Sequence, residues 1–437
     1  MSARILTSIP GPQSLALRAV ESSYLAPGIQ QISTLAGLAM AGGEGALLED
    51  VDGNRFIDWV AGIGVASIGH GHPQFAAALA EQAGRLSSTS FTSPPRVELL
   101  RRIVEHSPDP SLDRVQLYSS GAEAVESALR LARAHTGHSE VIAFWGGFHG
   151  KTHGVLGLCG SEFKQGQLPL LPGQHLAPYA DCQRCPLRQQ KETCQLACVD
   201  FLRDFIRLST AGRLAAILVE PIQGTAGNVL PHPDFLPALR QVADENRALL
   251  IVDEMITGFG RTGSLWASVA ASVVPDIVIF GKGVAAGFPL SGLVTRAELA
   301  AARPWSEPSH SSSSFGGNPL ACAAANVTTR IIIDDQLAAH AARVGTRLRN
   351  GLEALAEQFP CIRAVRGRGL LLGFDLFDGE TAWSKERCVA LFQGCLSRGL
   401  LTMAYTPRVR INPPLVVSEA QVDESLAILA DALRSLG

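Results

Sequence analysis

Lysine is scarce in this chain of 437 residues, in which five lysines stand against 32 arginines. The arginines are dispersed, no basic block exists, and the formal net charge is −3, which argues against nucleic-acid binding. No apolar stretch approaches the roughly 20 residues that span a bilayer, and no apolar run before Pro10-Gly-Pro12 suggests a signal peptide. We therefore expect a cytoplasmic protein without a membrane or nucleic-acid partner. Nine cysteines in this length do not imply a disulfide framework.

Apolar residues make up 46% of the chain and charged residues 18%, which is typical of a globular protein of two or three packed units. Between residues 115 and 294, short apolar runs alternate with helical patterns. The runs are 115–118, 141–144, 216–219, 249–252, 277–280 and 293–294. Such alternation predicts an α/β fold with a largely parallel sheet covered on both faces. Residues 46–58 predict a hairpin that turns at Asp52-Gly53-Asn54.

Two residues that follow apolar runs suggest a specific chemistry. Lys282 comes just after the run 277–280, and Asp253 ends the run 249–252. An amine can form a Schiff base with pyridoxal phosphate (PLP), and a carboxylate can keep the pyridine nitrogen of that cofactor protonated. Lys282 alone could equally be a surface lysine beside a strand. Ser119-Ser-Gly121, Phe148-His149 and Glu220-Pro221 also follow such runs, however, and ligands bind beyond the carboxyl ends of parallel strands.

Ser120-Gly-Ala-Glu123 opens a helical pattern whose apolar residues recur at helical spacing. Ser120 and Glu123 have the spacing of a capping box, so the motif could simply begin a helix. A helix N-terminus after Ser-Gly also presents free backbone N–H groups to a phosphate. The two interpretations are compatible, and we adopt both.

Together the motifs resemble the class III, fold-type I PLP-dependent aminotransferases from about Gly45 to the end of the chain. The motifs are Asp52-Gly-Asn-Arg-Phe-Ile-Asp58, Gly69-His-Gly-His-Pro73, Ser119-Ser-Gly-Ala-Glu-Ala124, Phe148-His-Gly-Lys-Thr152, Glu220-Pro-Ile-Gln-Gly224, Asp253-Glu-Met-Ile-Thr-Gly-Phe-Gly-Arg-Thr-Gly263, Gly281-Lys-Gly283, Phe315-Gly-Gly-Asn-Pro-Leu-Ala321 and Arg368-Gly369. The resemblance implies a large domain with a mainly parallel seven-stranded sheet and a smaller α+β domain from the two terminal segments. We place these at 66–320 and at 1–65 with 321–437.

The resemblance also implies residue roles. Lys282 would carry the cofactor and shuttle the proton, and Asp253 would pair with the pyridinium nitrogen. Ser314 would reach the phosphate of a partner subunit, which implies a homodimer with shared active sites. The other cofactor-binding positions implied are Ser120, Gly121, Ala122, Phe148, His149, Glu220, Gln223 and Ile256.

Substrate-binding positions implied by the resemblance are Arg410, Lys151, Ile63 and Thr225. Arg410 matches an arginine that clamps a substrate carboxylate. Thr225 replaces a glutamate that screens this arginine in many members, and Ile256 replaces a glutamine, as in members that use ω-amino acids or amines. Lys151 replaces an arginine of members that use glutamate or 4-aminobutyrate. These departures do not agree on one amino donor.

Four cysteines fall within a polar, loop-like insertion at 179–198: Cys182, Cys185, Cys194 and Cys198. A C-x2-C knuckle followed by a second close pair is typical of a structural zinc site. The alternative is four reduced thiols in a packed loop.

We predict an aminotransferase that moves an amino group between an amine or ω-amino acid and a keto acid such as pyruvate or 2-oxoglutarate. The alternative is a PLP-dependent racemase or epimerase, which would use the same lysine but return the proton to the opposite face. A cofactor-binding or metal-sensing protein without turnover is a third possibility, against which the complete set of Lys282, Asp253, Ser120 and Arg410 argues.

Overall fold

The computed structural model describes residues 2–436 and divides into two compact units. Unit 1 comprises Met1–Ala76, Arg261–Gly263 and Ile331–Gly437, and unit 2 comprises Ala77–Gly260 and Ser264–Arg330. The domain boundaries expected from the sequence lie at 65/66 and 320/321, and these boundaries remain a prediction. Positions 1 and 437 of the expected terminal segments lie outside the described residues.

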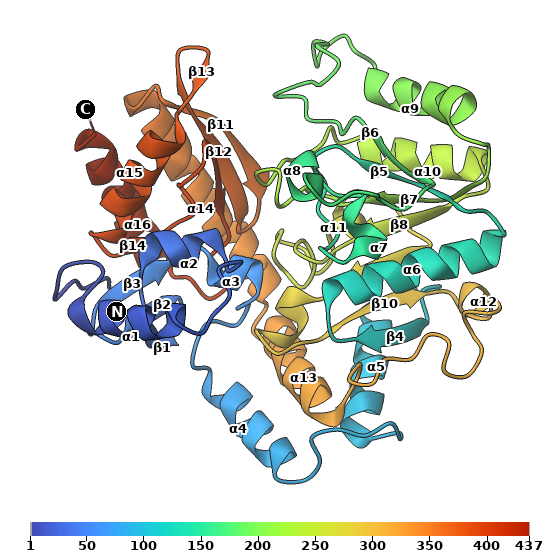
Figure 1. The fold of residues 1–437 in the computed structure, drawn as a ribbon, viewed down its shortest axis with the longest axis horizontal. Helices are drawn as coiled ribbons and strands as arrows, with labels where there is room; N and C mark the ends of the chain where they lie inside the picture. Colours follow the sequence, from blue (N-terminus) through green and yellow to red (C-terminus); the bar gives the residue numbers. More distant parts are fainter. Residues whose placement is uncertain (1, 437) are drawn as a thin grey trace. The chain divides into compact units, whose positions relative to one another are not determined.

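Unit 2 is built on a seven-stranded sheet with the order β4-β10-β9-β8-β7-β5-β6 (Figure 1). The strands are β4 (Arg114–Tyr118), β5 (Glu140–Phe144), β6 (Gln174–Ala177), β7 (Leu214–Val219), β8 (Leu249–Asp253), β9 (Ile277–Phe280) and β10 (Ser291–Thr295). Strands β5 to β9 pair in parallel, whereas β10 is antiparallel to both β9 and β4. Strand β4 therefore runs in the same direction as the other five. This confirms the predicted mainly parallel sheet, and all six apolar runs are strands.

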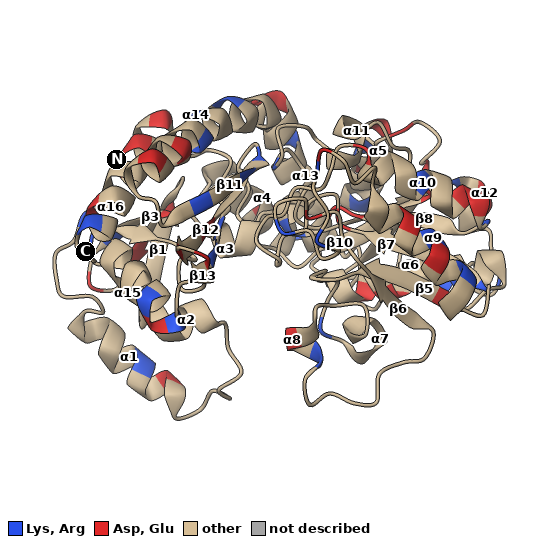
Figure 2. Ribbon diagram, turned by 90° about the horizontal axis from the view of Figure 1, so that it is seen from above, with Lys and Arg blue, Asp and Glu red and all other residues tan. Residues whose placement is uncertain are grey.

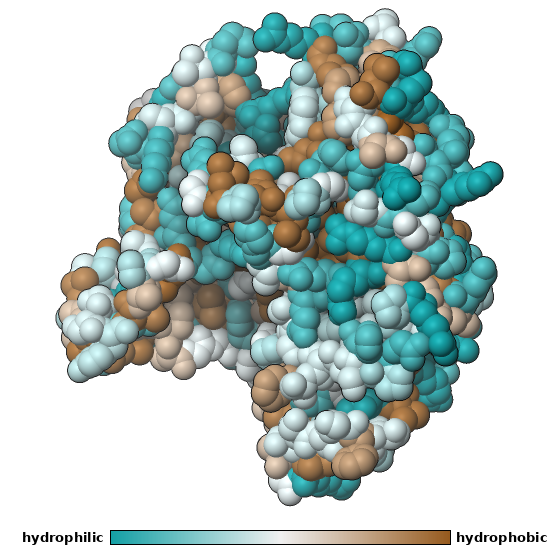
Figure 3. Space-filling view, turned by 45° about the vertical axis from the view of Figure 1, so that its right-hand side comes forward, coloured by the Kyte–Doolittle hydropathy of each residue, from teal (hydrophilic) through white to brown (hydrophobic). Residues whose placement is uncertain are grey.

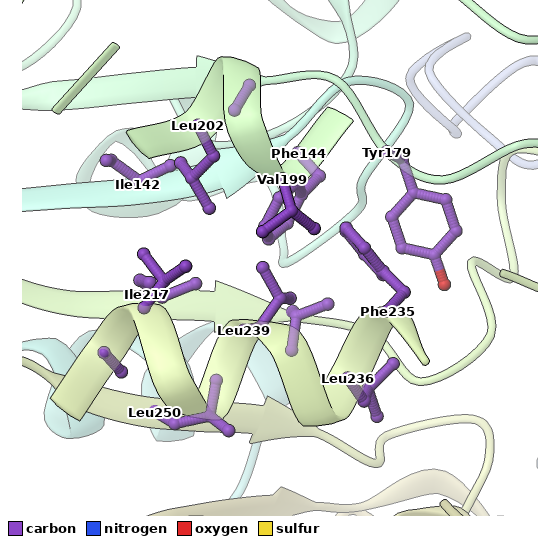
Figure 4. Packing of buried hydrophobic residues seen from close by; sticks show 14 of the residues in the cluster. Ile142, Phe144, Tyr179, Val199, Leu202, Ile217, Phe235, Leu236, Leu239 and Leu250 are labelled. Atoms are coloured by element: carbon purple, nitrogen blue, oxygen red, sulfur yellow. The ribbon is translucent and has the colours of Figure 1, made fainter. Parts of the chain in front are cut away.

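Successive residues of the central strands face opposite sides of the sheet, as strand geometry requires. Ile142 and Phe144 pack in one cluster with α9 (Ala197–Ser209) and α10 (Phe235–Glu245), as Figure 4 shows. Val141 and Ala143 pack in the other cluster, with α6 (Gly121–Thr136). Because both faces are covered, the strand interiors are apolar, and polar residues of the strands are left for their ends.

The remaining helices of unit 2 are short or lie at its periphery. They are α5 (Pro94–Glu105), α7 (His153–Leu156), α8 (Ser161–Lys164), α11 (Ala267–Ala270), η1 (Lys282–Ala285) and α12 (Ala297–Ala300), with α4 (Pro73–Ala83) and α13 (Pro319–Asp334) crossing the unit boundaries along the chain.

Unit 1 contains two four-stranded sheets. One has the order β1-β2-β3-β14 and the other the order β11-β12-β13, with β15 paired to β12. Its strands are β1 (Met40–Glu44), β2 (Leu47–Asp50), β3 (Arg55–Asp58), β11 (Ile362–Arg368), β12 (Leu371–Asp378), β13 (Thr381–Ala382), β14 (Leu400–Leu401) and β15 (Arg408–Ile411), and its helices are α1 (Pro12–Ser22), α2 (Gln31–Ala36), α3 (Ala61–Gly64), α14 (Leu337–Gln358), α15 (Lys385–Leu396) and α16 (Glu419–Arg434). Strand β14 pairs in parallel with β3, so the N- and C-terminal segments share one sheet.

The predicted hairpin is formed by β2 and β3, which are antiparallel. Its turn also fixes the N-terminal segment. The carboxylate of Asp52 accepts the backbone N–H groups of Gln13 (2.8 Å) and Ser14 (2.9 Å), which begin α1. The side-chain oxygen of Asn54 accepts those of Leu6 and Thr7.

Charges of both signs are interspersed along the helices of each unit, as Figure 2 shows for α14 and α10. On the face drawn in Figure 3, hydrophobic residues form small patches between hydrophilic ones. None of the helices within residues 2–436 combines the length and the apolar character needed to cross a membrane.

Candidate active site

The motifs of unit 2 lie where its strands end. Strand β5 leads to Phe148-His149, β7 leads to Glu220, β8 ends at Asp253 and β9 leads to Lys282. Because these strands and β4 run in the same direction, their carboxyl ends lie at the same edge of the sheet. The reversed strand β10 begins at this edge, where the Ser291 hydroxyl donates to the Ser120 carbonyl oxygen at 2.7 Å.

The N-terminus of α6 is capped and also presents backbone N–H groups that an anion could bind. The Ser120 hydroxyl oxygen accepts the Glu123 N–H at 3.3 Å, and the Glu123 carboxylate accepts the Ser119 and Ser120 N–H groups at 3.0 and 3.3 Å. This confirms the predicted capping box. The N–H groups of Gly121 and Ala122 belong to the first helical turn and have no carbonyl partner within the helix. The hydroxyl oxygen of Ser119 is buried without a hydrogen-bond partner among the described residues, so the cap still has donors for a phosphate.

Met255 connects the cap with the segment that carries Lys282. A Cβ atom on Gly121 would lie 3.3 Å from the Met255 sulfur, and one on Gly281 would lie 2.3 Å from it. Gly281 therefore cannot be replaced without moving Met255. Lys282 follows as the first residue of η1, with a φ of 43°, which is unusual for a side-chain-bearing residue. The chain thus turns sharply where the lysine leaves β9.

Asp253 forms a buried pair with His149. The His149 ring nitrogen Nδ1 lies 2.8 Å from the Asp253 carboxylate, and the two side chains are 1% and 2% exposed. The second carboxylate oxygen accepts the Met255 N–H at 3.0 Å. Because a carboxylate only accepts hydrogen bonds, Nδ1 carries the proton of this bond. His149 therefore fixes the orientation of the Asp253 carboxylate.

Glu220 holds two segments of the site by their backbones. Its carboxylate accepts the N–H groups of Phe148 at 2.9 Å and Gly224 at 3.0 Å. Burial raises the pKa of Glu220, the charge of His149 lowers it, and that of Asp253 raises it. Glu220, which was predicted to bind the cofactor, thus uses its carboxylate to bind backbone N–H groups. These hydrogen bonds position Phe148 and Gly224.

Other predicted cofactor positions surround this carboxylate. The Gln223 amide donates to the Trp145 carbonyl oxygen at 3.0 Å. Ile256 packs against Gly224, where an added Cβ atom would lie 3.1 Å from its side chain. Thr225 follows directly and is partly exposed.

The Phe148 ring is part of an aromatic group at the surface of unit 2. It meets the Phe163 ring edge to face, with centroids 5.0 Å apart. The Lys151 ammonium lies 5.5 Å from the centre of the Phe163 ring. Lys151 is exposed, so this contact leaves its charge accessible to a ligand.

Two predicted substrate positions, Ile63 and Arg410, belong to unit 1. Ile63 lies in α3 with φ 67° and ψ 54°, a left-handed conformation that is rare for a β-branched residue. Arg410 lies on β15 opposite Gly373 of β12. Among the described residues, its guanidinium has no hydrogen-bond or ion-pair partner.

Ser314, predicted to serve a partner subunit, is exposed, and the Phe315 side chain beside it is 67% exposed. The segment before them is anchored to unit 2, because the Ser311 carbonyl oxygen accepts the Gln116 amide at 3.1 Å and the Tyr118 hydroxyl at 3.0 Å. Ser314 therefore lies exposed, three residues after the point where its loop is hydrogen-bonded to β4.

The four-cysteine zinc site predicted at Cys182, Cys185, Cys194 and Cys198 is not formed in this structure. Within residues 2–436, no group of three or more His, Cys, Asp or Glu side chains is arranged to hold a metal ion. The Cys185 sulfur accepts the Gln189 N–H at 3.4 Å, and Cys198 packs in the hydrophobic cluster under α9. Burial, followed by the charges of Cys182 and Cys194, raises the pKa of Cys198 to about 11. The raised pKa favours the protonated thiol of Cys198, whereas a zinc ligand would be a thiolate.

A model of the family described as aminotransferase class-III matches residues 31–433. The acetylornithine aminotransferase of Methanopyrus kandleri is 38% identical over 398 residues, which cover 90% of this chain and 94% of that protein. The 5-aminovalerate aminotransferase DavT of Pseudomonas aeruginosa is 34% identical and covers 90% of this chain and 92% of its own. A PLP-bound amine transaminase from an uncultivated Pseudomonas species superposes with a TM-score of 0.89 at 28% identity, covering 95% and 99% of the two chains.

The chain belongs to the class III aminotransferase family. It is a PLP-dependent enzyme of fold type I, as the resemblance of its motifs implied. The family match supports amino-group transfer rather than the racemase alternative. The arrangement in unit 2 fits the cofactor, since free donors at α6, the Asp253 carboxylate and the Lys282 turn follow strands that end at one edge.

Proposed function

We propose that this aminotransferase takes its amino group from a donor that carries its amine away from its carboxylate and delivers it to a keto acid. The name 5-aminovalerate aminotransferase describes a relative that uses a donor of this kind. Ile256 supports the proposal, because an aliphatic residue stands where many members of the family have glutamine, as in members that use ω-amino acids or amines.

Pyridoxal phosphate, when bound, takes up the amino group and delocalises the electrons left at the substrate carbon. Lys282 would supply the amine that holds the cofactor and would move the proton of the substrate carbon. The Asp253 carboxylate, held by His149 and the Met255 N–H, would stabilise the proton on the ring nitrogen. The N–H groups of Gly121 and Ala122 and the Ser119 hydroxyl would hold the phosphate.

The observation that carries the substrate proposal is that the Arg410 guanidinium has no hydrogen-bond or ion-pair partner within residues 2–436. A free guanidinium can bind a carboxylate through two parallel hydrogen bonds. The residue at position 225 is threonine, so no carboxylate at that position competes for the arginine. At least one of the two half-reactions should therefore use a substrate with a carboxylate.

The test is stopped-flow absorbance of each half-reaction, with 5-aminovalerate, with a simple amine without a carboxylate, and with pyruvate or 2-oxoglutarate. A donor that delivers its amino group removes the absorbance of the pyridoxal form, and a keto acid restores it. We expect the ω-amino acid to react faster than the amine, and Arg410→Lys to remove most of this preference.

Arg363→Lys is the matched control, because Arg363 is also in unit 1 but lies near the exposed Glu380 at 3.9 Å. It should leave both half-reactions unchanged. Equal rates for donors with and without a carboxylate would contradict the substrate proposal. Racemisation of an amino acid without any keto acid would contradict transfer itself.

We also propose that the enzyme acts as a homodimer in which Ser314 serves the partner subunit. Phe315 and Phe91 are 67% and 82% exposed, and both are large apolar side chains of unit 2 that a second copy would cover. Phe315→Glu should then shift the protein toward monomers in sedimentation velocity and weaken cofactor binding. A Phe315→Glu protein that remains dimeric would show that the interface lies elsewhere.

A further inference from the structure

The segment that carries Phe148 and His149 has no regular secondary structure, so it does not satisfy its own backbone hydrogen bonds. Two side chains from other parts of unit 2 take over this role. The Phe148 N–H donates to the Glu220 carboxylate, and the His149 N–H donates to the Cys159 sulfur at 3.3 Å. The two residues expected beside the cofactor ring are thus held one by a carboxylate and one by a thiol.

Cys159 contacts this segment twice. Its sulfur lies 3.1 Å from the Gly150 carbonyl oxygen, to which the thiol can donate while it accepts the His149 N–H. Gly150 has a φ of 127°, and an added Cβ atom would lie 2.6 Å from the Cβ of Ala122 in the first turn of α6. The thiol therefore fixes the backbone between the Asp253 partner and the phosphate-binding turn.

The thiol is in the state that this role requires. Cys159 is fully buried. Burial raises its pKa, and the neighbouring charges of Glu220 and Asp253 act in the same direction. The sulfur therefore keeps its proton for the Gly150 carbonyl oxygen at neutral pH, and it does not act as a nucleophile.

We propose that Cys159 is a positioning residue for the reaction: it holds the His149 backbone so that the imidazole stays hydrogen-bonded to Asp253. The inference rests on the proposed role of Asp253 toward the ring nitrogen of the cofactor. No cofactor atom contacts the thiol in this scheme. Its effect passes through the His149 backbone to the Nδ1 bond, and from there to the orientation of the carboxylate.

The test compares Cys159→Ala, Cys159→Ser and Cys322→Ala. Alanine leaves the buried His149 N–H without an acceptor, whereas serine keeps an acceptor and a donor at this position. Cys322 is the matched control, because it is also fully buried in unit 2 but lies in α13. Three quantities are measured: the dissociation constant of pyridoxal phosphate from the apoenzyme, the pH midpoint of the absorbance of the bound cofactor, and the melting temperature.

We expect Cys159→Ala to weaken binding of pyridoxal phosphate roughly three- to tenfold, the equivalent of one neutral hydrogen bond, and to shift the pH midpoint. Cys159→Ser should restore both values toward the parent. Cys322→Ala should lower the melting temperature without moving either. The proposal is overturned if Cys159→Ala changes only the melting temperature, or if Cys322→Ala moves the midpoint as far. A parent protein that does not bind pyridoxal phosphate would instead refute the proposed function.

Discussion

Asp253→Asn separates the charge of this residue from its structural contacts. The asparagine oxygen can still accept the Met255 N–H, for which the present distance is 3.0 Å. The amide nitrogen can donate to His149 Nδ1 if the imidazole moves its proton to the other ring nitrogen. Both hydrogen bonds survive in neutral form, so we expect the variant to fold. Only the negative charge is lost.

The expected effects on stability and on activity differ in size. Exchanging a charge-assisted hydrogen bond for a neutral one costs about 1 kcal/mol, which lowers the melting temperature by a few degrees at most. In the proposed role, the carboxylate would in contrast balance the positive charge of the protonated ring nitrogen inside a buried site. Catalytic electrostatic contributions of this kind are worth ~3 kcal/mol, so turnover should fall on the order of a hundredfold.

The assay measures kcat for amino transfer and the melting temperature for the parent, Asp253→Asn and Asp276→Asn. Asp276 is also a buried carboxylate in unit 2, but it precedes β9 and pairs with Arg240 at 2.6 Å and with Arg296. Because the loss of this charge removes the ion pairs of Asp276 with both arginines, Asp276→Asn should cost more stability than Asp253→Asn and less activity. A kcat of Asp253→Asn within about tenfold of the parent would refute the assigned role, as would an equal loss in both variants.

Lys282→Ala should abolish turnover while the protein still folds and binds pyridoxal phosphate noncovalently, which reduction with borohydride and peptide mapping will check. Arg410→Lys should raise the KM of carboxylate substrates about ten- to a hundredfold, since charge-assisted bonds contribute ~1.5–3 kcal/mol, and steady-state kinetics will show whether substrates without a carboxylate are spared. Glu220→Gln should flatten part of the pH dependence of stability. The folded protein holds this proton more tightly than the unfolded chain, whose ordinary carboxyl pKa is 4.5, so the parent should lose stability relative to the variant as pH rises above that value. Melting curves of the apoenzyme from about pH 4.5 to 7 will test this, and a constant difference would contradict it.

The strands of unit 2 were predictable because both faces of the sheet are covered, which makes the strands continuous apolar runs. Strand β6 was not predicted, because it lacks such an apolar run. Its sequence, Gln174-His-Leu-Ala177, begins with two polar residues, because it is an edge strand and three of its four residues are only partly buried. Its identity depends on pairing with β5, which the local sequence does not encode.

The positions of the candidate catalytic residues at the ends of strands were predictable from motifs, but the residues that contact and hold them were not. Lys282 and Asp253 lie at the ends of apolar runs. A residue in such a position is expected at the edge of a parallel sheet where ligands bind. Cys159 has no such signal. Its contact with the His149 N–H depends on a fold that brings together two residues ten positions apart in the chain. Met255 also has no sequence signal, because its side chain acts only by filling the space beside Gly121 and Gly281.

The cysteine insertion shows what spacing alone cannot establish. A C-x2-C pair and a second pair predict a tetrahedral site only if the chain brings four sulfurs toward one point. Here Cys198 belongs to α9 and is committed to the core on one face of the sheet, whereas Cys185 accepts a hydrogen bond from its own turn.

The same physical requirement explains both Glu220 and Cys159. Catalytic side chains at the end of a strand leave the sheet, and the irregular segment that carries them loses the backbone hydrogen bonds of the ladder. A buried N–H without an acceptor is costly, so a neighbouring element must provide one. Glu220 at the end of β7 does so for Phe148, and Cys159 beyond α7 does so for His149. The residues that accept these backbone hydrogen bonds therefore also orient the side chains of Phe148 and His149. In this way the buried thiol of Cys159, which is not itself reactive, can influence the chemistry at Asp253.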